Sequence, residues 1–244
     1  MTARRFVPQQ HGAWAMLVVP WLAGVLVVGL RWPHLPLLGA WLAGYPLSYY
    51  ALQAVKTRRL QRVKAQLALY GSAAAVLAAV VAVARPSVLL YLPAYAVLLA
   101  VNVLHARLRR ERALLNDLAS VAQSCLMLFV VASVAGVEPV QVVPAFLVVT
   151  LYFTGTVLYV KTMIRERGNV VYQRLSAALH TLALAVASLL GVLVVALFAL
   201  LLVRAVALPR QPLTPKQVGI IEIVACVLVL VAAVTANPTL SLAA

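Results

Sequence analysis

The sequence has little charge, and acidic residues are scarcer still. Of its 244 residues only 10% are charged and 65% are hydrophobic, whereas about a quarter of the residues in soluble domains are charged. A soluble core could not bury this much apolar surface, but a lipid bilayer accepts it, and a spanning helix needs about 20 mostly apolar residues. The composition therefore predicts an all-α membrane protein in which residues 1–244 form a single polytopic domain.

The sequence also lacks the motifs of common enzyme and metal sites. Its two cysteines, Cys125 and Cys226, lie inside apolar runs and have no metal-ligand spacing. We expect them to pack as small hydrophobic side chains. A phosphate-binding glycine loop, a serine triad and a zinc motif are all missing. We therefore predict no metal site and no cofactor.

Apolar runs bounded by charge, proline or glycine predict about nine transmembrane helices. The run from 175 to 208 is too long for one span, so we expect it to fold back near Gly191. The predicted spans are residues 13–30, 35–55, 65–84, 87–106, 113–135, 140–160, 175–190, 192–208 and 218–236.

The basic residues are segregated between alternate loops. Eighteen of the twenty lie on the side that carries the N-terminus, and only Arg31 and Arg85 lie on the other side. Because cytoplasmic loops carry an excess of Lys and Arg, the N-terminus is predicted to be cytoplasmic. In a soluble protein the net charge of +15 would suggest a nucleic-acid partner. Here topology accounts for it, so we predict membrane lipids as partners and no nucleic acid.

Polar residues inside the predicted spans also gather in the cytoplasmic half. Asp117, Gln123 and Glu222 lie four or more residues inside their spans, which favours a cavity that opens to the cytoplasm, because buried ionisable groups usually face a bundle interior. His105 and Arg204 lie closer to loops and could equally extend toward the membrane surface. The other polar residues of this half are His11, Gln53, Asn102, Asn116 and His180.

The densest polar cluster follows the sixth predicted span. If the helix continues through this cluster, Lys161 and Arg165 share a helix face at positions i and i+4, and two cations there would repel unless an anion lay between them. Lys56 and Arg58, after the second span, form another cationic group, and Val-Lys-Thr occurs at both span ends, at 55–57 and 160–162. Topology and contact with anionic lipid account for the same charges, so both interpretations stay open.

Three residues are candidates for acid–base chemistry. His11, at the entrance of the first span, could titrate near neutral pH, and a purely structural histidine fits as well. Asp117 is the one aspartate of the chain; we expect it to be ionised and paired with the basic residues of 109–112, or else to carry a proton or cation. Glu166 is the acidic residue of the cluster after span six, while Asn116 and Tyr159 are candidates for ligand contact.

Four segments resemble the YwiC-like family of bacterial membrane proteins: residues 8–16 (Pro-Gln-Gln-His-Gly-Ala-Trp-Ala-Met), 114–118 (Leu-Leu-Asn-Asp-Leu), 155–169 and 215–220. The resemblance covers nearly the whole chain and implies a bacterial cytoplasmic membrane location. The family is of uncharacterised function, so the resemblance implies no activity.

The chain more distantly resembles the UbiA-type intramembrane prenyltransferases. That resemblance implies a UbiA-like bundle of nine helices, with an active site at the loops after helices two and six, which correspond to 46–59 and 155–167. The family holds Mg²⁺ there with Asp-rich motifs, as magnesium requires oxygen ligands. In this chain residues 45–53 contain no acid and the second loop offers only Glu166, so a two-site magnesium mechanism is not expected.

Together these features predict a protein that binds an amphipathic anionic ligand, such as a lipid, a quinone precursor or an isoprenoid phosphate, without Mg²⁺. Lys56, Arg58, Lys161 and Arg165 would hold the anion, and Asp117 with His11 would orient it or transfer a proton. A metal-independent, prenyltransferase-like enzyme and a non-catalytic carrier both fit this prediction. The alternatives are a small proton-coupled transporter, using Asp117, Glu222 and the histidines, and an accessory subunit of a membrane complex.

Overall fold

The computed structural model describes residues 6–8 and 11–237, and the regular structure within them is entirely helical. The long helices are α1 (His11–Val28), α2 (His34–Thr57), α3 (Lys64–Ala84), α4 (Leu92–Arg107), α5 (Leu114–Cys125), α6 (Met127–Ala135), α7 (Val143–Ile164), α8 (Val170–Ala187), α9 (Val192–Ala207) and α10 (Pro215–Thr235). Short 3₁₀ helices adjoin them: η2 (Leu60–Arg62), η3 (Pro86–Tyr91), η4 (Pro139–Val142) and η5 (Leu208–Arg210).

These helices make nine passes in the described residues, because α5 and α6 form one pass interrupted at Leu126. Seven of the passes are long and apolar enough to cross a membrane. The other two are α1, whose described apolar part is the short segment Gly12–Val28, and α2, whose tyrosines and prolines lower its hydropathy. The structure confirms the prediction of a multi-pass helical membrane protein.

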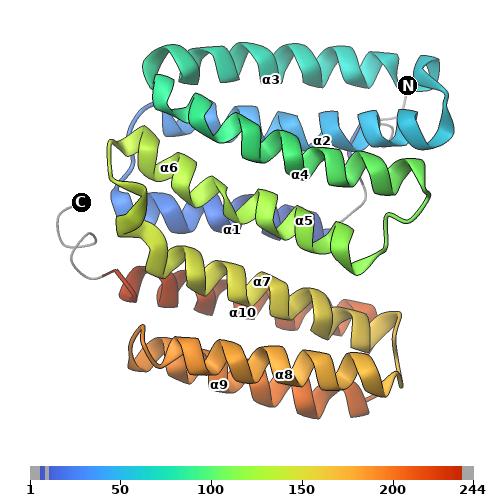
Figure 1. Cartoon of the computed structure of the whole chain (residues 1–244), viewed down its shortest axis with the longest axis vertical. Coiled ribbons are helices and arrows are strands. Elements are labelled where there is room, and N and C mark those ends of the chain that lie inside the picture. Colours follow the sequence, from blue (N-terminus) through green and yellow to red (C-terminus); the bar gives the residue numbers. More distant parts are fainter. Residues whose placement is uncertain (1–5, 9–10, 238–244) are drawn as a thin grey trace.

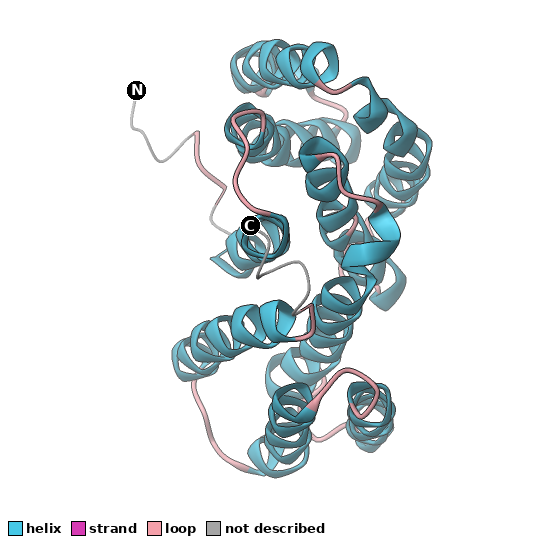
Figure 2. Ribbon diagram, turned by 90° about the vertical axis from the view of Figure 1, so that its left-hand side faces the viewer, coloured by secondary structure: helices cyan, strands magenta, loops and turns pink. Residues whose placement is uncertain are grey.

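The passes lie side by side along the long axis of the molecule (Figure 1). Helices α2, α3 and α4 occupy one end of this axis, α8 and α9 the other, and α1, α5, α6, α7 and α10 lie between them. Figure 2 shows the helices nearly end on. The central helices supply most of the buried apolar residues, whereas Val81 is the one buried residue of α3. Helix α7 lies in the middle of the molecule and packs against α1, α5, α8 and α10.

Four connections lie at the same end of the helices, on the right in Figure 1: residues 58–63, 108–113, 165–169 and 208–214. We call this the polar end. Among the described lysines and arginines, all but Arg31 and Arg85 lie at this end or within the last turns of helix that lead to it. That this end faces the cytoplasm stays a prediction from its charge.

The first pass contains a proline, and a neighbouring helix replaces the hydrogen-bond donor that the proline lacks. Pro20 lies inside α1 and has no N–H to donate to the carbonyl of Met16, four residues earlier. The hydroxyl of Ser124 on α5 donates to that carbonyl instead, and the indole Nε1 of Trp41 on α2 donates to the adjacent carbonyl of Leu17 at 3.1 Å. These bonds hold α1 against both neighbouring helices, since a bilayer offers no water to free carbonyls.

Two helix boundaries follow from local sequence. Gly191 adopts a φ of +121°, where other residues are strained, and lies between the end of α8 and the start of α9. Helix α8 begins at Val170, five residues before the predicted span, because the Asn169 side chain accepts hydrogen bonds from the backbone N–H groups of Val171 and Tyr172.

Candidate functional site

Helix α7 carries polar side chains on two of its flanks. Tyr152, Thr156 and Tyr159 follow one another at helical spacing and contact α9 and α10. Lys161, two residues further along, points to α5 instead. Residues two apart on a helix face in nearly opposite directions. The half of the bundle nearer the polar end, which we call the polar half, therefore contains two separate networks, one on each side of α7.

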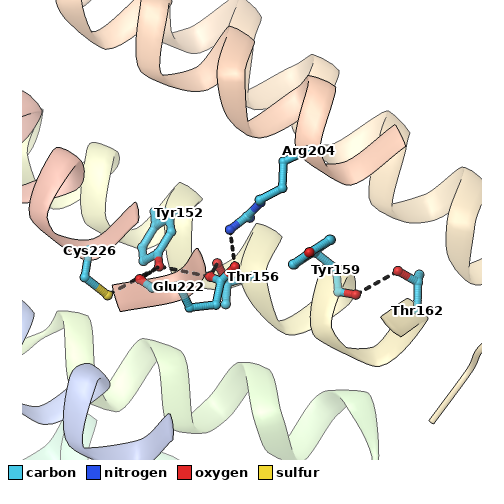
Figure 3. A network of polar contacts seen from close by, with 7 residues as sticks. All are labelled: Tyr152, Thr156, Tyr159, Thr162, Arg204, Glu222 and Cys226. Carbon is cyan, nitrogen blue, oxygen red and sulfur yellow. Dashed lines mark hydrogen bonds and ion pairs between the residues drawn. The ribbon is translucent and has the colours of Figure 1, made fainter. Parts of the chain in front are cut away.

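The first network is centred on an ion pair between Arg204 of α9 and Glu222 of α10 (Figure 3). Arg204 donates from Nη1 to Oε1 of Glu222. The hydroxyls of Tyr152 and Thr156 each donate to Oε2 at 3.0 Å, and the Tyr152 hydroxyl also lies 3.3 Å from Sγ of Cys226. Both carboxylate oxygens of Glu222 are thus hydrogen-bonded, as the charged form of a buried acid requires.

Arg204 is nine-tenths buried, with 7% of its surface exposed. Its guanidinium carbon lies 4.2 Å from the centre of the Tyr159 ring, a cation–π contact. Its Nε and Nη2 atoms are buried and make no hydrogen bond to any described residue. The same is true of the fully buried hydroxyls of Tyr159 and Ser176. The guanidinium of Arg204 and these two hydroxyls therefore have buried polar atoms without a partner among the described residues.

A layer of apolar side chains covers this network on the side of the polar end. Met163, Leu208 and Val218 each lie one helical turn closer to that end than the Tyr159, Arg204 and Glu222 positions, and they cluster together with Tyr159. In the loops of the polar end, Nη2 of Arg167 donates to the carbonyl oxygen of Gln211 at 2.9 Å, which links the loop of residues 165–169 to that of residues 208–214. The layer separates the ion pair from the loops.

His180 of α8 packs directly against the backbone of α7. Its Nδ1 lies 2.7 Å from the carbonyl oxygen of Ser176, so Nδ1 carries a proton that it donates to that oxygen. A methyl group at Gly155 would lie 3.0 Å from Nε2, closer than ordinary contact, so His180 would have to move to accommodate it. Gly155 thus permits the close approach of the two helices.

The second network joins Lys161 of α7 to the start of α5. Its ammonium lies 2.7 Å from Oδ2 of Asp117 and donates to the carbonyl oxygen of Arg112 at 2.8 Å. Lys161 is 7% exposed, whereas about a quarter of the Asp117 side chain is accessible. The pairing of Asp117 expected from the sequence is present, but its partner is Lys161 and not an arginine of 109–112.

The loop of residues 108–113 is held from three helices. Besides Lys161, Lys56 of α2 pairs with Glu111 at 2.6 Å, and Nδ2 of Asn116 donates to the Glu111 carbonyl oxygen at 2.8 Å. The hydrogen bond from Lys56 holds the pKa of Glu111 below its usual value. The lysines of the two Val-Lys-Thr sequences therefore bind one acidic residue within this loop and one in the helix that follows it.

Of the residues predicted to hold an anion, the structure pairs two with acids and leaves two exposed. Lys56 and Lys161 each have a carboxylate partner, while Arg58 and Arg165 are exposed. Arg165 is the C-cap of α7, one turn after the buried Lys161. Of the remaining candidates, Tyr159 lies in the Arg204 network and Asn116 beside Asp117.

Of the other acid–base candidates, Glu166 bonds within its own loop. Oε2 of Glu166 accepts a hydrogen bond from Nδ2 of Asn169 at 2.9 Å, within the same loop. His11 is the first residue of α1, and its side chain lies outside the described part of the structure.

The sequence interpretation missed Tyr152 and Thr156, and it left Arg204 undecided. A signal was present in the spacing, since Tyr152, Thr156 and Tyr159 are polar at i, i+4 and i+7 of one span. No group of three His, Cys, Asp or Glu side chains in the described residues is arranged to hold a metal ion.

An apolar groove lies away from both networks. It has a volume of about 290 Å³ and runs between the ends of α1 and α10 that are distant from the polar end. It is lined by Leu26, Val227, Leu230, Val231, Val234 and Thr235. The predicted cavity that opens to the cytoplasm stays a prediction.

Comparison with known proteins identifies relatives along most of the chain. Residues 7–132 match the family described as YwiC-like protein. An uncharacterized protein of Haemophilus influenzae is 32% identical over 223 residues, which are 88% of this chain and 92% of the relative. The uncharacterized protein YwiC of Bacillus subtilis is 31% identical over 189 residues, 77% of this chain and 79% of the relative. No solved structure matches the chain, and the resemblance to UbiA-type prenyltransferases stays a prediction.

Proposed function

Because the chain belongs to the YwiC-like family, whose relatives above are uncharacterized, we propose a function from its own side chains. The protein binds an amphipathic anionic molecule in the polar half of its helices, without Mg²⁺. A lipid, a quinone precursor and an isoprenoid phosphate all have this chemistry. The bacterial origin of the relatives supports a place in the bacterial cytoplasmic membrane.

The observation that carries this proposal is the burial of Arg204 inside an apolar spanning helix. A guanidinium cannot lose its charge in a protein, and a charged group in a membrane is costly. Such a residue is retained where it binds a substrate, an ion or a counter-ion. The net charge of +15 adds an electrostatic attraction for anions at the polar end.

The use of the acidic residues supports a function that does not depend on magnesium. Asp117, Glu111 and Glu222 each form an ion pair with a lysine or arginine. Their charge is neutralised by these cations, whereas a magnesium site would need carboxylates directed at the metal.

Native mass spectrometry of the protein purified in mild detergent tests the proposal. We expect an anionic, lipid-like species to remain bound to the wild type and to be lost from Lys161→Gln or Arg204→Gln. Arg85→Gln is the matched control, because Arg85 is exposed at the opposite end. Retention of the same species by both polar-half variants, or its absence from the wild type, would refute the proposal.

A second candidate is a small proton-coupled transporter. It is favoured by the two carboxylates, Asp117 and Glu222, that lie within spanning helices on opposite flanks of α7. In proteoliposomes loaded with a pH-sensitive dye, Asp117→Asn should abolish proton flux. Glu138→Gln should leave flux unchanged, since Glu138 lies exposed in a loop at the opposite end. Equal flux with and without the protein would exclude this candidate.

A further inference from the structure

We propose that Arg204 and Tyr159 form a buried binding site for a single oxyanion, either a carboxylate or a monoanionic phosphate, carried on an apolar molecule. This inference rests on the proposed function and names the atoms and the headgroup chemistry of the site.

The first observation is the unused edge of the Arg204 guanidinium. Nη1 is bound to Glu222, while Nε and Nη2, which are adjacent on the other edge, are buried without a partner among the described residues. These two N–H groups form the parallel donor pair that binds carboxylates and phosphates through two hydrogen bonds. Buried donors without an acceptor are costly, so the edge calls for an acceptor with two oxygens.

Glu222 is not available to fill this edge. Its Oε1 accepts from Nη1 of Arg204, and its Oε2 accepts from the hydroxyls of Tyr152 and Thr156 at 3.0 Å each. The carboxylate is thus held by three donors from two helices (Figure 3). The carboxylate neutralises the guanidinium when no ligand is bound, and it leaves the Nε and Nη2 atoms of Arg204 without an acceptor.

Tyr159 carries a further buried donor and stacks on the guanidinium. Its ring lies under the guanidinium, with 4.2 Å between the ring centre and Cζ of Arg204. The Tyr159 side chain is fully buried, yet its hydroxyl makes no hydrogen bond to a described residue. A hydroxyl can donate to an oxyanion, so the proposed site includes this group together with the guanidinium edge.

The surroundings of the site favour an anion that carries an apolar chain. The layer of Met163, Leu208 and Val218 separates Arg204 from the loops of the polar end. On α9 itself, the neighbouring Val203 is 62% exposed and Leu200 is 54% exposed, which places lipid-facing surface beside the buried arginine. An amphipathic molecule can reach the site from the bilayer, whereas a free soluble anion has to pass the apolar layer.

The test measures binding of three probes to the purified full-length protein in neutral maltoside detergent: dodecyl phosphate, dodecanoate and inorganic phosphate. Native mass spectrometry gives the stoichiometry, and the ligand-dependent rise in melting temperature gives the apparent Kd. We expect one molecule of dodecyl phosphate or dodecanoate to bind the wild type saturably. Arg204→Lys, which keeps the charge but removes the donor pair, should raise the Kd about 10-fold or more.

Tyr159→Phe should raise the Kd a few-fold, because it removes only the hydroxyl and keeps the ring under the guanidinium. It serves as the second variant if Arg204→Lys fails to fold. Arg210→Lys is the matched control at the exposed end of η5 and should bind like the wild type.

The outcomes separate this site from the broader proposal. Saturable binding of inorganic phosphate as tight as that of dodecyl phosphate would identify a free anion and refute the amphipathic ligand. Equal Kd values for the wild type, Arg204→Lys and Tyr159→Phe would refute the site. If Lys161→Gln then lost the co-purified species while Arg204→Lys kept it, ligand binding in the polar half would stand and only its assignment to Arg204 would fall.

Discussion

Breaking the Arg204–Glu222 pair from one side should destabilise the protein far more than removing both partners. Glu222→Met leaves a guanidinium that is 7% exposed without a counter-charge. Removing one partner of a buried pair costs about 3–5 kcal/mol. Arg204→Met should cost less, about 1–3 kcal/mol, since Glu222 keeps its two hydroxyl donors and its side chain is more exposed than that of Arg204, at 16% against 6%.

The double variant Arg204→Met, Glu222→Met should recover most of this loss, because replacing a buried pair by apolar residues of similar volume is often neutral or stabilising. Its free energy of unfolding should lie within about 1 kcal/mol of the wild-type value, giving a coupling energy of about 3 kcal/mol or more. Titration with sodium dodecyl sulfate in mixed micelles, followed by far-UV circular dichroism, measures all four proteins.

The Lys56–Glu111 pair provides an internal comparison. Its side chains are 46% and 33% exposed, and exposed pairs contribute about 0–1 kcal/mol. The same cycle at Lys56→Met and Glu111→Met should therefore give a coupling energy below about 1 kcal/mol. A Glu222→Met variant as stable as the wild type, or equal coupling energies in the two cycles, would show that the burial of Arg204 does not make its ion pair more important for stability than an exposed pair.

Two further predictions concern packing and pH. Gly24→Ala places a methyl 2.9 Å from the side chain of the buried Val131, so it should cost about 1–3 kcal/mol despite the better helix propensity of alanine. Gly44→Ala has nothing within 4 Å of the added methyl and should be neutral or stabilising. Thermal unfolding compares the two variants, and equal melting temperatures would contradict the packing argument. Because the pKa of Glu111 is lowered in the folded protein, its contribution is present above the unfolded value of about 4.3 and is lost as the pH falls through the folded value. Acidification from about pH 6 to about pH 3 should then lower the melting temperature of the wild type slightly more than that of Glu111→Gln. A larger fall in the variant would contradict a stabilising contribution from ionised Glu111.

The passes could be predicted from the sequence because each depends on a local property. An apolar run has to be helical in a bilayer, since its backbone groups have no other partners there. Gly191 and Pro86 mark breaks by their own backbone preferences, and the segregation of Lys and Arg is visible without any structure.

The pairing of side chains between passes could not be predicted in the same way. Whether Asp117 meets Lys161 or an arginine of 109–112 depends on how α5 and α7 are rotated about their axes, and packing between helices decides that rotation. Arg165 follows Lys161 by one helical turn, at the C-cap of α7, but it is exposed whereas Lys161 is buried, and the depth of each side chain depends on the packing of the neighbouring helices. Arg204 was ambiguous because its distance from a loop is compatible with either a surface or a buried position.

The proline in the first pass has a consequence for the order in which the chain assembles during synthesis. The carbonyl of Met16 enters the membrane with α1 without its helical N–H partner. Trp41 arrives with the next pass and adds a bond to the carbonyl of Leu17, but Ser124, which binds the carbonyl of Met16, is made only with the fifth. This carbonyl therefore stays without a partner until the fifth pass has been inserted, and the final docking of α1 is a late event in biogenesis, although α1 is the first of these passes to be made.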